Sequence, residues 1–162
     1  MALDTNSTAI ISPCGTYRHT LKRRWAAGPT CGFIMLNPST ADAEHDDPTL
    51  RRCISFAKRE GCGGLIVTNL YQLRATDPAE LRRHPDPIGP SADEYLLLAA
   101  AAADGPLIAG WGTKGGDRGE HVAAMFSGVL WCLGRSKAGH PIHPLYRPAD
   151  APLVPLFPEA RT

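Results

Sequence analysis

The sequence predicts a single α/β domain, a three-layer α/β/α sandwich around a mainly parallel open sheet of four or five strands. Four short apolar runs, each bounded by turn residues, have the length of buried strands, at residues 31–36, 64–70, 106–112 and 129–134. Segments with helical patterns separate these runs, and strands that alternate with helices indicate parallel pairing with helices on both faces. A chain of 162 residues that is 43% hydrophobic is long enough for one domain with a real core.

The sequence of the first 36 residues predicts a leader and two strands. We expect residues 1–13 to form a flexible leader and residues 14–162 to form the domain. Residues 17–25 alternate apolar or aromatic positions with polar ones, which is the period of a half-buried strand. The inward positions of this pattern are Tyr17, His19, Leu21 and Trp25. The run at 31–36 lies between turn signals and is expected to be a central strand.

Residues typical of helix ends predict three helices. Asp47 is expected to cap a helix whose first position is Pro48 and which stops at Gly61. Ser91 and Glu94 form a capping-box pattern before a second long helix that ends at Gly105. A further helix is expected within residues 116–128. The last segment, 137–162, is rich in proline and is predicted to be an ordered loop with a short terminal piece.

Composition excludes several classes of function. The formal net charge is +1, so there is no general electrostatic case for nucleic-acid binding. No apolar run has the length of a membrane span, and the N-terminus lacks a signal-peptide pattern, so we expect a cytoplasmic protein that does not enter membranes. The five cysteines contain no C-x-x-C pair and are expected to be reduced thiols. We expect no metal or redox cofactor, and the sequence leaves the oligomeric state open.

Polar motifs follow each of the four apolar runs. Ligands of open α/β sheets bind outside the carboxyl ends of the strands, so these motifs are expected to meet at one edge of the sheet. The motifs are Asn37-Pro38-Ser39-Thr40, Asn69 with Tyr71, Trp111-Gly112, and the loop from Gly139 to Tyr146 that includes His143. Asparagine both donates and accepts hydrogen bonds, which suits the edge of a nucleobase. Tyr71, Trp111 and Tyr146 could stack on a planar ligand.

The chain resembles a bacterial and phage family known only as a domain of unknown function, DUF1643. The motifs that carry the resemblance are MLNPSTAD, DDPTLRRC, VTNLYQLRAT, AGWG and GHPIHPLY, and the resemblance as a whole covers about Tyr17 to Tyr146. This resemblance implies membership of a family but no activity.

The order of the motifs is also similar to that of the uracil-DNA glycosylase superfamily. In that superfamily a first strand ends in Asn or Asp before Pro, a second strand ends in Asn, a later strand ends in Trp-Gly, and a final loop contains His-Pro. That similarity implies a uracil-DNA-glycosylase-like fold and places Asn37 beside the water that attacks the sugar carbon. It implies that Asn69 binds the edge of the base and that His143 stabilises charge on the departing base. Pro38, Ser39, Thr40, Tyr71, Trp111, Gly112 and Tyr146 are then expected to contact the substrate.

Three hypotheses about function follow from these patterns. The first is an enzyme that acts on an N-glycosidic bond or base in a nucleic acid, nucleotide or nucleoside, with DNA or RNA as a possible partner. The second is a non-catalytic module that binds a nucleobase or nucleotide. The third is a hydrolase, assisted by a metal, that uses the acidic segment 42–47 with His45.

Overall fold

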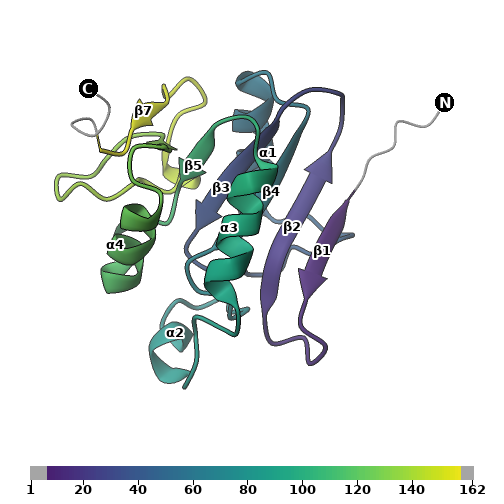
Figure 1. Ribbon diagram of the computed structural model, residues 1–162, viewed down its shortest axis with the longest axis vertical. Helices are drawn as coiled ribbons and strands as arrows, with labels where there is room; N and C mark the ends of the chain where they lie inside the picture. Colours follow the sequence, from purple (N-terminus) through teal and green to yellow (C-terminus); the bar gives the residue numbers. More distant parts are fainter. Residues whose placement is uncertain (1–6, 158–162) are drawn as a thin grey trace.

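The computed structural model describes residues 7–157, which build one seven-stranded sheet in the order β1-β2-β4-β3-β5-β6-β7 (Figure 1). The strands are β1 (Thr8–Ile11), β2 (Arg18–Arg24), β3 (Thr30–Met35), β4 (Gly64–Asn69), β5 (Leu107–Ala109), β6 (Leu130–Cys132) and β7 (Val154–Pro155). The four central strands β4, β3, β5 and β6 are parallel to one another, as predicted from the apolar runs. The outer pairings β1·β2, β2·β4 and β6·β7 are antiparallel. The sheet is therefore mixed, and the prediction of a mainly parallel sheet of four or five strands is wrong.

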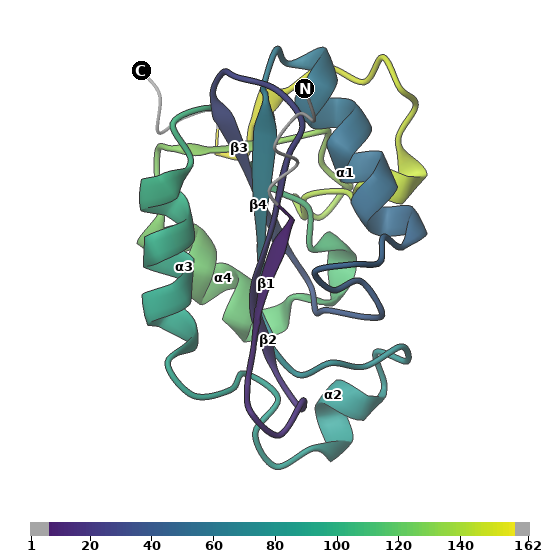
Figure 2. The same ribbon diagram turned by 90° about the vertical axis from the view of Figure 1, so that its right-hand side faces the viewer.

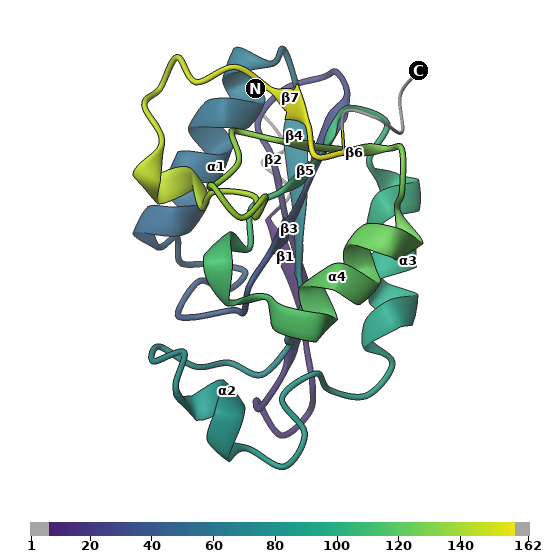
Figure 3. The same ribbon diagram turned by 90° about the vertical axis from the view of Figure 1, so that its left-hand side faces the viewer.

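Helices cover both faces of the sheet. The helices are α1 (Pro48–Arg59), α2 (Glu80–Arg83), α3 (Ala92–Ala102) and α4 (Gly116–Met125), with short 3-10 turns η1 (Gly112–Lys114) and η2 (Pro144–Tyr146). Seen along the sheet, α1 lies on one face, and α3 and α4 lie on the other (Figures 2 and 3). Two apolar clusters follow this division, one built around Phe33, Leu50 and Phe56, and the other around Leu96 and Val122.

The two predicted helix caps, Asp47 and Ser91, can be compared with the N-termini of α1 and α3. Asp47 caps α1, since its Oδ1 accepts the backbone N–H of Leu50 at 2.8 Å, and this prediction is confirmed. Helix α3 is also present, but its predicted capping box is wrong. Ser91 has φ 59° and makes no side-chain capping bond. A capping side chain needs an extended backbone at that position to reach the first turn, and a left-handed one directs it elsewhere.

The first strand was not expected. Residues Thr8–Ile11 lie within the segment predicted to be a flexible leader and form β1 against β2 instead, while residues 1–6 lie outside the described residues. The pairing contains a β-bulge: Ile10 lies opposite Thr20, and Ile11 lies opposite Arg18, so His19 is the extra residue of β2. The bulge breaks the predicted alternation in β2.

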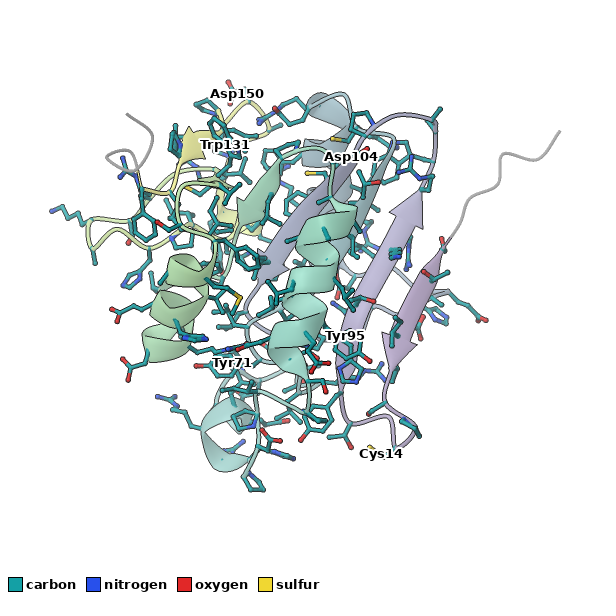
Figure 4. The ribbon with its side chains drawn as sticks, in the orientation of Figure 1. Cys14, Tyr71, Tyr95, Asp104, Trp131 and Asp150 are labelled. Atoms are coloured by element: carbon teal, nitrogen blue, oxygen red, sulfur yellow. The ribbon has the colours of Figure 1, made fainter. Side chains whose placement is uncertain are left out.

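Both faces of β2 are covered, which also departs from the half-buried strand predicted. Arg18, Thr20 and Arg23 are buried, although the pattern placed the first two on the exposed side. On one face His19 stacks on Tyr95 of α3, with ring centroids 4.2 Å apart, and Figure 4 shows Tyr95 on that helix. On the other face the two arginines bond to the loop that precedes α1.

The proline-rich tail is mostly loop, as predicted, but it also contains η2 and adds β7 as the last strand of the sheet. Within residues 7–157, no helix combines the length and the apolar character needed to cross a lipid bilayer.

Candidate functional site

A cavity of about 460 Å³ lies at the carboxyl ends of β3, β4 and β5, beside the start of α1. Its walls come from the loop after β3, the end of β4, the loop after β5, and the η2 segment beyond β6. The volume lies within the usual range for small-molecule sites, roughly 300–1,000 Å³. The parallel central strands produce this convergence, because all of them end at the same edge.

Most of the residues predicted from sequence line this cavity. Eight of the ten do so: Asn37, Pro38, Ser39, Asn69, Trp111, Gly112, His143 and Tyr146. Thr40 and Tyr71 are not among the lining residues. The hydroxyl of Tyr71 donates to the carbonyl of Gly115 at 3.2 Å, and burial raises the pKa of that phenol. Tyr71 therefore fixes the loop before α4, and the expectation that it contacts the ligand has no support from its position.

Asn37 presents one polar atom to a ligand. Its Nδ2 donates to the backbone carbonyls of Ala75 at 2.8 Å and Pro38 at 3.0 Å. These two bonds tie the loop after β3 to the segment after β4 and hold the amide in one orientation. The acceptor Oδ1 remains for a ligand or a water molecule.

Asn69 is buried at the end of β4 and is oriented by Arg18. Its Oδ1 accepts from Arg18 Nη2 at 3.4 Å, while Arg18 Nη1 donates to the carbonyl of Ala41 at 2.9 Å. Because the oxygen faces the guanidinium, the Nδ2 of Asn69 is the group that can donate to a ligand.

His143 is held as a neutral donor. Its Nδ1 accepts the backbone N–H of Leu145 at 3.1 Å and thereby caps η2. A ring nitrogen that accepts carries no proton, so the proton of the neutral ring lies on Nε2. Burial lowers the pKa of His143, against an opposing effect of Asp47, and this favours the neutral ring. Arg52 of α1 donates to the carbonyls of Pro144 and Arg147 and fastens the His143 loop to the helix.

Trp111 forms a rigid wall because two glycines allow it to pack closely. A Cβ on Gly115 would lie 2.7 Å from Trp111 Cδ1, and one on Gly119 would lie 3.0 Å from Nε1. Gly112 has φ 76°, a left-handed conformation that favours glycine, and its N–H donates to the carbonyl of Pro141 at 2.9 Å. The Trp-Gly motif therefore connects the end of β5 to the histidine loop.

The acidic segment has a structural partner that the sequence did not reveal. Arg23 donates to the carboxylate of Asp46 at 3.0 Å and to the carbonyls of Asp42 and His45. Asp42 accepts the backbone N–H groups of Glu44 and His45 and contacts the ring of His45, and these bonds lower its pKa to about 2. Within residues 7–157, no group of three or more metal-binding side chains comes together. The segment folds around Arg23, and Asp47 is its one residue that lines the cavity.

Sequence reasoning missed several polar residues of the cavity. These are Arg18, Thr49 and Thr76. Asp47, Thr113 and Lys114 also line the cavity. Asp47 was expected to cap a helix or, with the rest of segment 42–47, to serve a metal-assisted hydrolase, and its position shows that a cap at the carboxyl edge of a sheet also borders the cavity. Arg18 was assigned to an exposed position, because a bulge at His19 is not visible in the alternation of residue types.

Comparison with known proteins agrees with one of the two resemblances. The model of a family described as "Protein of unknown function (DUF1643)" matches residues 18–145. No curated protein and no solved structure matches the chain. The matched range runs from β2 into η2 and includes every residue that lines the cavity except Tyr146. The chain therefore belongs to the DUF1643 family of proteins of unknown function.

Proposed function

We propose that this protein binds a nucleobase-containing ligand in the cavity and hydrolyses its N-glycosidic bond. The observation that carries the proposal is the convergence of three side chains on one cavity: Asn37 from the loop after β3, Asn69 from the end of β4, and His143 from the loop after β6. The motif order that resembles uracil-DNA glycosylases supports the same choice of ligand, by analogy with that superfamily.

The free polar atoms complement a base and its leaving group. Asn69 Nδ2 would donate to an acceptor on the base edge, and His143 Nε2–H would donate to the base as it takes up the electron pair of the broken C–N bond. Asn37 Oδ1 would accept a hydrogen bond from the water that attacks the sugar carbon. The water's proton passes to solvent, because an amide is a poor base.

A non-catalytic nucleobase-binding module is the second candidate, and one observation favours it. Asp47 is the carboxylate that borders the cavity, and both of its oxygens accept backbone N–H groups, from Leu50 at 2.8 Å and Ala41 at 3.3 Å. These bonds commit the carboxylate to holding the start of α1 and the loop before it. A site without a strong general base fits binding better than rapid hydrolysis.

Asn69→Asp gives a sharp test of base binding. The aspartate keeps the size of the side chain and the oxygen that faces Arg18, but it replaces the Nδ2 donor with an acceptor. We expect nucleobase ligands to bind at least about tenfold more weakly to this variant, because a site built to hydrogen-bond a ligand loses its partner. Calorimetric titration with nucleosides and nucleotides measures the change, and unchanged affinity contradicts the proposal.

Chromatographic detection of free base separates the two candidates. Wild-type protein is incubated with nucleosides, nucleotides and short single-stranded oligonucleotides, and release of base supports the enzyme. Binding without release in all three supports the module.

A further inference from the structure

We propose that the ligand is anionic and that a phosphate or carboxylate group on it binds against Arg18. This inference deepens the proposed function and rests on the same cavity: it identifies the ligand as a nucleotide, or as a base that carries a carboxylate, in preference to a neutral nucleoside.

Among the described residues 7–157, Arg18 is a buried cation that forms no ion pair. It is 5% exposed, it lines the cavity, and no carboxylate of residues 7–157 forms an ion pair with it. Its Nη atoms bond to two neutral oxygens, those of Ala41 and Asn69, and its buried Nε has no hydrogen-bond partner in this part of the chain. A buried charge is unfavourable unless it is paired, and an anionic ligand would supply the pair.

The charges around the cavity favour an anion as well. Arg18 and Lys114 are the cations of its wall and Asp47 is its carboxylate, while His143 is neutral. Both Asp47 oxygens already accept backbone N–H groups. Burial lowers the pKa of Arg18 to about 10, with Arg74 and Arg23 adding to the effect and Asp47 opposing it. The guanidinium remains charged at neutral pH, in a positive local field that an oxyanion would relieve.

Arg18 also holds a loop, through Ala41, and Arg23 provides a matched control for that role. Both arginines are buried in β2 and donate to carbonyls of the loop before α1. Arg23, however, is paired with Asp46 and does not line the cavity. Arg18→Met and Arg23→Met therefore both remove a loop anchor, but Arg18→Met alone removes a cation from the cavity.

The experiment measures the affinity of four probes by calorimetric titration: a nucleoside, its 5′-monophosphate, inorganic phosphate, and a carboxylated pyrimidine base. We expect the monophosphate or the carboxylated base to bind wild type and Arg23→Met about tenfold or more tightly than the nucleoside does, since charge-assisted bonds are the stronger ones. Arg18→Met should lose this preference. Whichever anionic probe binds more tightly identifies the group as phosphate or carboxylate.

If Arg18→Met does not fold, competition in wild-type protein still tests the inference. Inorganic phosphate should displace the bound monophosphate, whereas chloride at equal ionic strength should not displace it. Equal affinity for the nucleoside, the monophosphate and the carboxylated base, unchanged by Arg18→Met, overturns the inference and leaves the proposed function standing. Arg18-dependent binding of phosphate with no contribution from the base keeps the anion site and overturns the proposed function. Absence of binding by all four probes overturns both.

Discussion

Arg18 Nη2 donates to Asn69 Oδ1 across 3.4 Å and so joins β2 to the carboxyl end of its antiparallel neighbour β4. The contact orients the amide that the sequence singled out, with its donor side free for a ligand. It also places a buried guanidinium at the edge where the parallel strands end. The antiparallel strand β2 therefore supplies the buried cation of the site.

Replacing Arg23 with methionine should destabilise the fold. The change removes the ion pair to Asp46 and the bonds to the carbonyls of Asp42 and His45, which leaves the acidic loop without its anchor. Because Asp46 is partly exposed, we expect the free energy of unfolding to fall by roughly 2 kcal/mol, below the range for fully buried pairs. Urea denaturation measures it. Lys22→Met, at an exposed position of β2, is the control and should stay within about 0.5 kcal/mol of wild type.

Two substitutions of His143 separate its two ring nitrogens. Asparagine places an acceptor near the position of Nδ1 and so keeps the bond to Leu145, whereas glutamine places a donor near Nε2 and loses that bond. If His143 stabilises charge on the leaving base, base release should fall about 10²-fold or more in His143→Asn and less in His143→Gln. If base release is slower in His143→Gln than in His143→Asn, the main role of His143 is to cap η2.

Cys14 should be the one reactive thiol of the chain. It is exposed near the turn between β1 and β2 (Figure 4), and hydrogen bonds with Ser12 and Thr16 lower its pKa to about 7. The other four cysteines are buried, and burial raises the pKa of each. Because the thiolate is the nucleophile, the rate of alkylation should rise with pH through an inflection near 7. Peptide mass spectrometry after brief iodoacetamide treatment checks this, and labelling of a buried cysteine at a comparable rate contradicts it.

A methyl group at Gly115 should disturb the Trp111 wall. The added Cβ would lie 2.7 Å from Trp111 Cδ1, so Gly115→Ala forces the indole or the loop to move. We expect a loss of about 1–3 kcal/mol in stability, as for other overpacked sites, together with weaker ligand binding. Thermal unfolding and tryptophan fluorescence report the two effects. Glu120→Ala, on the exposed side of α4, should leave both unchanged.

The sequence predicted those parts of the structure that local patterns determine. The four apolar runs became the parallel strands, and Asp47 capped α1 as expected, because burial and capping depend on residues close in the chain. The convergence of eight site residues followed from parallel pairing alone. The antiparallel strands β1 and β7 were missed, because four residues beside a polar leader and two residues in a proline-rich tail carry no periodicity.

The chemistry of the arginines could not be predicted for a related reason. Arg18 and Arg23 are surface residues by type, and their burial depends on a bulge at His19 and on a loop that returns over β2. A similar contact explains the acidic segment 42–47: the carboxylate of Asp46 and the carbonyls of Asp42 and His45 accept from Arg23, a residue about twenty positions earlier in the chain. Contacts between distant segments leave no local pattern in the sequence.

Chemical-shift mapping tests the central claim most directly. In ¹⁵N-labelled protein, titration with a nucleoside monophosphate should shift the side-chain amides of Asn37 and Asn69 and the indole N–H of Trp111, all of which border one cavity. The backbone amides of Leu97 and Leu98, exposed on α3, should not move. Saturable shifts at the three cavity side chains would bear out a nucleobase site at the carboxyl edge of the sheet. Shifts absent from all three, or confined to α3, would contradict it.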